Sequence, residues 1–232
     1  EMLRKLSEDF GRFTGEQVNR FLHQHGLERP DIVCSHGHTV FHEPAKRYTL
    51  QIGDGQTIAN VTGIKCVNDF RSLDVSLGGQ GAPLVPIGDS LLFSEYDACL
   101  NLGGFSNISF VQENQRVAFD ICAVNIVLNE LAGRWGLSYA HNGDLARSGK
   151  LDEPLLDRLN NLEVLSAEKR PSLSREWVET SVRPLLSEAK LSDVDQMRTF
   201  VEHAAIQMAR VIERHVAGGK VLVTGGGAYN AF

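Results

Sequence analysis

The sequence predicts a mixed α/β protein, and the order of its apolar segments is the main reason. In the second half of the chain, three closely spaced strand candidates come first, at residues 98–102, 107–111 and 116–120. A helix over about residues 123–134 and further helical segments follow, and a last strand, residues 220–224, runs directly into three glycines. Strands and helices in this order are typical of mixed α/β folds.

The N-terminal half predicts a helix followed by short strands. Residues 1–25 show helical periodicity, with Thr14 and Gln17 as a capping box. The other expected elements are strands at 31–35, 48–52 and 64–67, a small helix at 56–61, and a long ordered loop at 69–86. Loops of this length in compact domains are often functional. A second unit begins near Asp97, which divides the chain into domains at 1–96 and 97–232.

The composition excludes several classes of protein. The chain has 232 residues, of which 42% are hydrophobic and 22% are charged, and its net charge is −6. These values are typical of a folded globular protein, and nucleic-acid binders normally carry a basic excess. No run approaches the roughly 18 apolar residues of a membrane span. We therefore expect a soluble acidic protein that binds neither nucleic acid nor membranes.

The cysteines and the chain ends indicate the compartment. Cys34, Cys66, Cys99 and Cys122 occur singly in apolar runs of strand character, where a lone cysteine is usually a small buried side chain. The charged N-terminal segment lacks the apolar core of a signal peptide, so we expect a cytoplasmic protein. Because the first residue is a glutamate and the last five follow a glycine triplet, we also expect a piece of a longer protein.

Two glycine turns follow predicted strands and are candidates for phosphate binding. Gly103 and Gly104 form the first, and Gly225, Gly226 and Gly227 the second. Glycines after a strand let the backbone approach a ligand and direct its N–H groups at a phosphate. The alternative is a pair of tight turns with no ligand. Neither turn matches the dinucleotide fingerprint or the P-loop pattern.

Asp120 is the candidate general base. It ends a predicted strand, where ligands bind in α/β sheets. Its apolar neighbours, among them Phe119 and Ile121, favour a raised pKa. The alternative is an aspartate that caps the following helix.

Arg71 and a histidine cluster are further candidates. Arg71 follows a predicted strand and is suited to bind a carboxylate with two hydrogen bonds, the alternative being a surface ion pair with Asp74. His36 and His38 have the spacing of zinc ligands on one strand face, although the same alternation suits a polar strand surface.

The same residues, taken together, resemble one family. The segments that carry the resemblance are Ser35 to His42, Thr49 to Asp54, Asp69 to Arg71 with Asp74, Gly78 to Pro86, Leu100 to Ile108, Phe119-Asp120 with Asn125, and Gly225 to Ala228 with Asn230. This string is similar to the anhydro-N-acetylmuramic acid kinases of bacterial cell-wall recycling, and it covers nearly the whole chain.

The resemblance implies a two-lobed actin/hexokinase-type (ribonuclease H-like) fold with mixed sheets, incomplete at both ends. Residues 1–96 would belong to the sugar-side domain and residues 97–232 to the nucleotide-side domain. The implied reaction uses ATP and Mg²⁺ to convert 1,6-anhydro-N-acetylmuramic acid, with water, to N-acetylmuramic acid 6-phosphate. The implied partners are therefore a small sugar and ATP, and the resemblance leaves room for a homodimer.

The resemblance also implies roles for individual residues. Asp120 matches the base that activates water against the anomeric carbon. Gly103 and Gly104 match the turn at the phosphates, and Gly225, Gly226 and Gly227 the turn at the adenosine. The residues expected at the sugar are His36, Gly37, Thr39, Asp69, Arg71, Gln80 and Asn125.

Several positions depart from the family pattern. Ile121 to Val124 replace the T-G-P-G of the usual F-D-T-G-P-G-N motif, so that both glycines and the proline are absent. His38, Phe41 and Ala140 stand where glutamine, tryptophan and aspartate are usual, and the G-T-S-x-D-G phosphate loop is missing. These departures leave a second hypothesis open, a non-catalytic sugar- or nucleotide-binding relative of the kinases.

Overall fold

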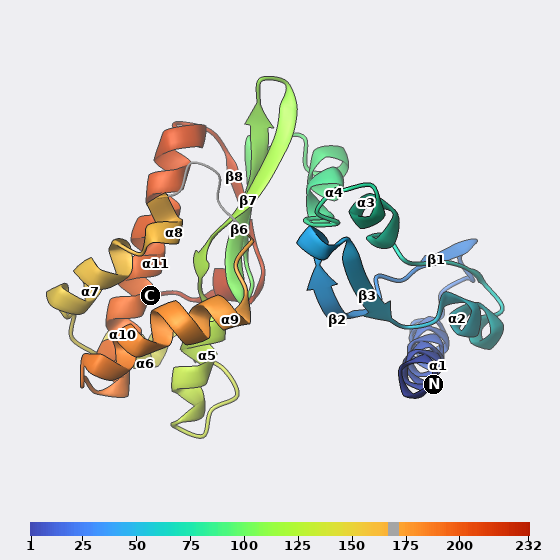
Figure 1. Cartoon of the computed structure of the whole chain (residues 1–232), viewed down its shortest axis with the longest axis horizontal. Coiled ribbons are helices and arrows are strands. Elements are labelled where there is room, and N and C mark those ends of the chain that lie inside the picture. Colours follow the sequence, from blue (N-terminus) through green and yellow to red (C-terminus); the bar gives the residue numbers. More distant parts are fainter. Residues whose placement is uncertain (167–171) are drawn as a thin grey trace. The chain divides into compact units, whose positions relative to one another are not determined.

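The computed structural model describes residues 1–166 and 172–232 and divides the chain into two compact units, Glu1–Leu84 and Val85–Phe232 (Figure 1). Each unit contains helices and strands, and the mixed α/β class predicted from the sequence is confirmed. The assignment of a sugar-side and a nucleotide-side domain stays a prediction.

The first unit contains one long helix and two small sheets. Its elements are α1 (Met2–Gln24), β1 (Ile32–Cys34), β2 (His38–Glu43), a short 3₁₀ turn (Pro44–Lys46), β3 (Tyr48–Ile52), α2 (Gly55–Thr62), β4 (Lys65–Val67) and α3 (Ser72–Ser76). β1 pairs with β4 in parallel, and β2 pairs with β3 antiparallel. The three predicted strands and the small predicted helix of this half are thus present.

Helix α1 packs closely on α2 because two of its residues are glycines. A Cβ atom at Gly11 would lie 2.7 Å from the carbonyl oxygen of Asp54, and one at Gly15 would lie 2.9 Å from Val61. The expected capping box is wrong: Thr14 lies inside the continuous helix and its hydroxyl donates to the Phe10 carbonyl. A capping box stands at the start of a helix, whereas this helix already begins at Met2.

The segment expected to be a long loop, residues 69–86, contains more regular structure than its sequence predicts. It includes α3 and the start of α4 (Val85–Leu92). Asp69 adopts a positive φ of 59° and its carboxylate accepts from the Ser72 N–H, which helps α3 to begin. Residues 78–84 between the two helices are irregular.

The second unit begins with α4 and is built on one sheet with helices. After α4 its elements are β5 (Ala98–Leu102), β6 (Phe105–Gln112), β7 (Gln115–Ala123), α5 (Asn125–Gly133), a 3₁₀ turn (His141–Gly143), α6 (Asp144–Ser148), α7 (Glu153–Asn160), α8 (Glu163–Ser166), α9 (Arg175–Trp177), a π-helical turn (Val178–Val182), α10 (Arg183–Glu188), α11 (Asp193–Val216), β8 (Val221–Thr224) and a last 3₁₀ turn (Gly226–Tyr229).

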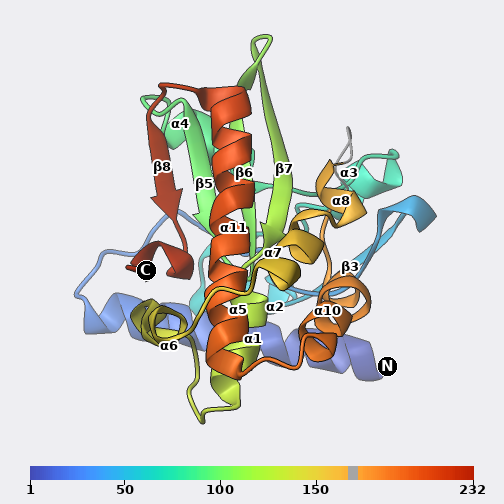
Figure 2. The same ribbon diagram turned by 90° about the vertical axis from the view of Figure 1, so that its left-hand side faces the viewer.

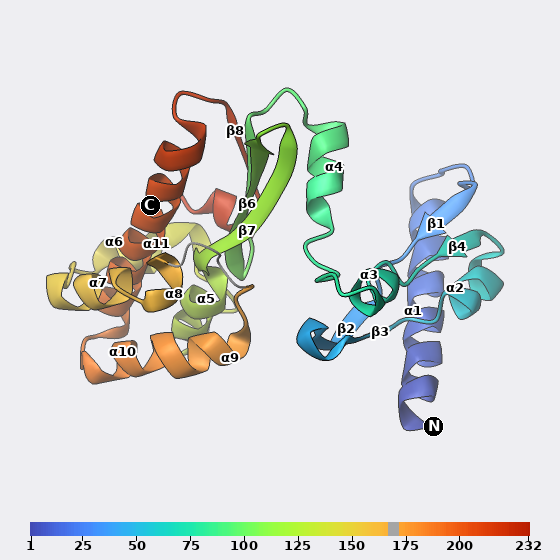
Figure 3. The same ribbon diagram turned by 45° about the horizontal axis from the view of Figure 1, so that its top comes forward.

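The sheet has the strand order β7-β6-β5-β8, with β8 parallel to β5 and the other neighbours antiparallel. One face of the sheet is apolar and packs on α11, which runs along the strands (Figure 2). Leu100, Ile108 and Phe119 stand opposite one another on this face, and Phe200 of α11 is completely buried in the same core. Helix α4 lies on the other side of the sheet (Figure 3), where Ser109 bonds to Asp89.

Strand β7 is longer than its sequence predicts. It continues to Ala123, past the expected end at Asp120, because Ile121, Cys122 and Ala123 are all buried against the core. The cysteines also differ from expectation. Cys99 and Cys122 are buried, but Cys34 is exposed because β1 belongs to a sheet of only two strands.

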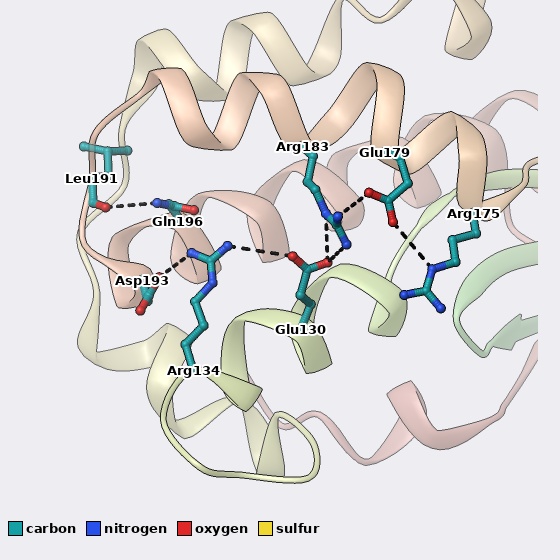
Figure 4. Close-up of polar contacts among 8 residues, drawn as sticks. All are labelled: Glu130, Arg134, Arg175, Glu179, Arg183, Leu191, Asp193 and Gln196. Atoms are coloured by element: carbon teal, nitrogen blue, oxygen red, sulfur yellow. Dashed lines mark hydrogen bonds and ion pairs between the residues drawn. The ribbon is translucent and has the colours of Figure 1, made fainter.

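Ion pairs connect α5 to the helices that follow it (Figure 4). Arg183 binds Glu130 at 2.7 Å and also pairs with Glu179. Arg134, at the end of α5, binds Asp193 in the first turn of α11 at 2.8 Å. These side chains are partly exposed, so the pairs orient the helices more than they stabilise them.

In the part of the chain that the structure describes, we find no helix with the length and hydrophobicity that crossing a membrane requires.

Candidate active site

A row of polar side chains crosses the sheet of the second unit at the end that carries the glycine turns. Thr224 of β8 stands opposite Asn101 of β5, Asn101 opposite Asn107 of β6, and Asn107 opposite Asp120 of β7. Directly opposite residues on neighbouring strands share one face of a sheet. These four residues, the polar row, therefore lie on the face opposite α11, with Asp120 at one end.

The two glycine turns meet beside this row because β5 and β8 are adjacent parallel strands. Gly225 has a φ of +84°, and a Cβ atom there would lie 2.7 Å from both the Asn101 side chain and the Leu102 carbonyl oxygen. A Cβ atom at Gly227 would lie 2.7 Å from the Cβ of Leu102. Only residues without a side chain allow the second turn to approach the first this closely.

Asn125 fixes the Gly103-Gly104 turn to the start of α5. Its side-chain N–H group donates to the carbonyl oxygens of Leu102 and Gly103, at 3.0 and 2.8 Å. The backbone N–H of Val124 donates to the Gly104 carbonyl at 2.8 Å. The structure places Asn125 between the two glycine turns, and its expected contact with the sugar stays a prediction.

A cavity of about 570 Å³ opens next to the turns. Asn125, Gly226 and Gly227 line one side, and Tyr139, His141 and Tyr229 contribute aromatic rings. This volume lies within the range of roughly 300–1,000 Å³ that is usual for small-molecule sites. Ala140, which replaces an expected aspartate, also lines the cavity. The cavity thus brings two tyrosines and a histidine to the same lining as Gly226 and Gly227.

Asp120 is half-buried, and two features of its environment shift its pKa in opposite directions. Burial raises the pKa of Asp120, and a hydrogen bond from the Leu173 N–H, at 2.8 Å, opposes this rise. The register shifts after Asp120: Asn107 pairs with Asp120 but Ser106 pairs with Cys122, so Ile121 forms a bulge. Bulges of this kind redirect side chains. The helix-cap alternative is wrong, since Val124 occupies the N-cap position of α5.

In the first unit, Arg71 is the centre of a second group. Its Nε donates to Nε2 of His36 at 2.9 Å, and Nη1 donates to the Gly81 carbonyl. Asp74 accepts from the Gly81 N–H at 2.6 Å. The surface ion pair between Arg71 and Asp74 is not formed among the described residues. Arg71 instead joins the histidine segment to the irregular segment 78–84.

The remaining residues expected at the sugar lie around this group. Gly37 has a φ of +71°, and a Cβ atom there would lie 2.4 Å from the Ile52 carbonyl oxygen. Thr39 faces Gln51 on the paired strand. Gln80 is exposed, and its backbone carbonyl accepts from His42. Burial, followed by the charge of Arg71, lowers the pKa of His42.

The zinc hypothesis finds no support in residues 1–166 and 172–232. No group of three or more His, Cys, Asp or Glu side chains in these ranges has an arrangement that could hold a metal ion. His36 is occupied as an acceptor for Arg71, and β2 begins only at His38.

The structure thus gathers the predicted residues into two groups. His36, Gly37, Thr39, Asp69, Arg71 and Gln80 lie in the first unit, and Asp120, Asn125 and the five glycines lie in the second. The sequence interpretation missed the polar-row residues Asn101, Asn107 and Thr224 and the aromatic side chains of the cavity. Asn101 and Asn107 were detectable as polar positions that alternate with apolar ones on either side of the Gly103-Gly104 turn.

Comparisons with known proteins identify the family. Residues 1–232 match the family model described as anhydro-N-acetylmuramic acid kinase. The protein of that name from Pseudomonas fluorescens is 34% identical over 96% of this chain and 64% of its own length. That from Pseudomonas savastanoi pv. phaseolicola is 36% identical over 94% of this chain and 63% of its own. The chain therefore spans slightly less than two thirds of the length of these relatives.

A search of solved structures found several matching chains, among them a distant likeness to an activator protein. The activator of the 2-hydroxyisocaproyl-CoA dehydratase from Clostridium difficile, with bound ADPNP, is 14% identical, with a TM-score of 0.36 over 79% of this chain and 72% of its own. A likeness at this level carries no argument about this chain. The family model matches the full sequence, and the curated relatives are about 35% identical. These two findings show that the chain belongs to the anhydro-N-acetylmuramic acid kinase family.

Proposed function

We propose that this chain is part of an ATP-dependent kinase that hydrolytically opens 1,6-anhydro-N-acetylmuramic acid and phosphorylates it to N-acetylmuramic acid 6-phosphate. One observation carries the proposal. The two glycine turns meet at one end of the strands, and the polar row that crosses the sheet beside them includes Asp120. This arrangement offers a phosphate-binding backbone and a half-buried carboxylate on the same sheet. Family membership supplies the substrate class.

The nucleotide is assigned to the second unit. The cavity beside Gly226 and Gly227 has the size and the aromatic rings to take an adenosine. The polyphosphate would then extend along the adjacent Gly103-Gly104 turn. Because the glycines carry no side chains, the backbone N–H groups can approach the phosphate oxygens.

Asp120 acts as the general base in this proposal. Its carboxylate takes one proton from a water molecule, and the water oxygen attacks the anomeric carbon as the bond from that carbon to the bridging O6 breaks. The remaining water proton stays on the new anomeric hydroxyl. O6 keeps the electron pair of the broken bond and attacks the γ-phosphorus of ATP, which releases ADP. A nearby carboxylate also stabilises the positive charge that develops on the sugar ring.

Magnesium would enter with the nucleotide. Mg²⁺ is usually held by substrate phosphates and only one or two protein oxygen ligands, which agrees with the lack of a ready-made metal cluster among the described residues. The side-chain oxygens of Asn101 and Thr224 are ligands of the right kind beside the turns. Bound Mg²⁺ would neutralise charge on the phosphates.

The first unit is assigned to the sugar. N-acetylmuramic acid carries a carboxylate, and the guanidinium of Arg71 is suited to bind one. The bonds from Arg71 to His36 and Gly81 hold the guanidinium in place, so its position is set before a ligand arrives. The proposed setting of this reaction is the cytoplasm, where ATP is available, and a homodimer stays a prediction.

The product of the complete gene tests the proposal. With ATP and 1,6-anhydro-N-acetylmuramic acid, mass spectrometry should find a sugar that has gained one water and one phosphoryl group, with an equal amount of ADP. A product that gained only the phosphoryl group would exclude the hydrolytic step. Binding of both ligands without transfer would favour the non-catalytic relative.

A further inference from the structure

The carboxylate of Asp120 is held by a backbone group far away in the sequence. The N–H of Leu173 donates to Oδ2 of Asp120 at 2.8 Å, and the two residues are 53 positions apart. Leu173 directly precedes Ser174, whose side chain accepts from the Trp177 N–H and so caps α9. The position of the Leu173 N–H is therefore tied to the start of a helix.

The hydrogen bond uses only one of the two carboxylate oxygens. Among residues 1–166 and 172–232, the Leu173 N–H is the group that donates to the Asp120 carboxylate, and it contacts Oδ2 rather than Oδ1. The bulge at Ile121 ends the regular register beside Asp120, and the buried run Ile121 to Ala123 begins there. One oxygen is thus fixed while the other remains able to accept a proton.

The electrostatic surroundings of Asp120 are simple. Burial raises the pKa of Asp120 and the Leu173 N–H lowers it, and no charged side chain of the described residues is a further cause. A hydrogen bond to a carboxylate favours its charged form. The Leu173 N–H is therefore what opposes protonation of a half-buried carboxylate.

An alternative explanation is that Asp120 only anchors the segment before α9. Ser174 already caps that helix, and a neutral acceptor such as an asparagine could bind the Leu173 N–H equally well. Burying a charged group for anchoring alone is unfavourable. The choice of a carboxylate at this position points to a role for its charge.

We propose that the backbone N–H of Leu173 is a positioning group for Asp120, which holds Oδ2 so that Oδ1 faces the water that attacks the sugar. This inference rests on the proposed function, since it takes Asp120 to be the general base. The segment before α9 then belongs to the catalytic apparatus through its backbone, whatever side chain residue 173 carries.

The test compares variants of the complete gene product that differ in this one N–H group. Leu173→Pro removes the N–H, and the matched control Leu173→Ala removes most of the side chain but keeps it. A second N–H-deficient variant replaces Leu173 by its α-hydroxy acid, which leaves an ester in place of the amide and avoids the conformational restriction of proline. Carboxyl ¹³C NMR of Asp120, assigned with Asp120→Asn, and the pH profile of kcat/KM are the two readouts.

Both variants without the N–H should titrate Asp120 about one pH unit higher than Leu173→Ala does, since hydrogen bonds to charged groups have about that effect. The acidic limb of kcat/KM should move by the same amount, while KM for the sugar changes little. Coincident titration curves for the ester and alanine variants would overturn the inference. If the wild-type protein transfers no phosphate, the proposed function has failed, and the NMR titration still reports separately whether the N–H holds the carboxylate.

Discussion

His203 shows how strongly this fold constrains one buried side chain. It lies on α11, is 1% exposed, and its Nδ1 is 2.8 Å from Oδ1 of Asn160. Gln207 donates to the same Asn160 oxygen at 2.8 Å. Because Asn160 Oδ1 can only accept, His203 must donate from Nδ1. Burial, with a smaller effect from Arg210, lowers the pKa of His203 to about 4.

The low pKa of His203 predicts a loss of stability in mild acid. Between pH 6.5 and about 4 the unfolded chain takes up a proton at this residue and the folded chain does not, so the free energy of unfolding falls as the pH falls. The full contribution is about 3 kcal/mol. His203→Gln keeps a donor for Asn160 and removes the titration. Denaturant unfolding at pH 7 and pH 4.5 should therefore show a smaller loss for this variant than for the wild type, and equal losses would refute the assignment.

For individual residues, the sequence predicted which residue types belong to the candidate site, but it did not predict their hydrogen-bond partners. Asp120 was found because it is a lone acid among apolar neighbours, and it does lie on a strand. Its hydrogen bond to Leu173 was not predictable, because it joins residues 53 positions apart through a backbone group that has no sequence signature. Arg71 and His36 were each selected by residue type, but their mutual bond depends on a fold that brings positions 35 residues apart together.

Among the elements, the glycine turns determine the geometry of the candidate site. The Gly225–Gly227 turn lies so close to β5 that a Cβ atom at Gly225 or Gly227 would clash with that strand. Asn125 then fixes the Gly103-Gly104 turn to the start of α5. Three elements that are separate in the sequence are joined at one edge of the sheet.

Two neighbouring alanine substitutions test this packing. In Gly227→Ala the new Cβ would lie 2.7 Å from Leu102 Cβ, whereas in the control Gly226→Ala the nearest atom, Asn125 Nδ2, is 4.0 Å away. Gly227→Ala should lower the free energy of unfolding by about 1–3 kcal/mol, the usual cost of overpacking. Gly226→Ala should leave it within about 0.5 kcal/mol of wild type. Equal thermal unfolding of the two variants would show that the turns do not pack as described.

Periodicity predicted most elements correctly and misjudged their ends. β5 and β3 have the predicted bounds because turn-forming residues flank both strands. β7 extends past Asp120 because the core buries Ile121 to Ala123, and this tertiary burial overrides the local pattern. Helix α3 was missed because it is only five residues long, too short to show a helical period.

At the scale of the molecule, two compact units carry the two groups of candidate residues. The mixed α/β class follows from the order of elements, and the chain belongs to the family that the resemblance named. The actin/hexokinase-type fold stays an implication of that resemblance. Of the residues expected at the sugar, all but Asn125 lie in the first unit, and those expected at the nucleotide lie in the second. The proposed reaction needs both groups, so it is a property of the whole protein.

The most direct measurement is the turnover of Asp120→Asn in the complete gene product, with binding of the anhydro sugar followed in parallel by calorimetry. The account predicts that kcat falls by at least about 10²-fold, because the general base is lost, while the Kd of the sugar changes little. The control Asp157→Asn, an exposed carboxylate on α7, should keep wild-type turnover. Wild-type turnover by Asp120→Asn would contradict the account.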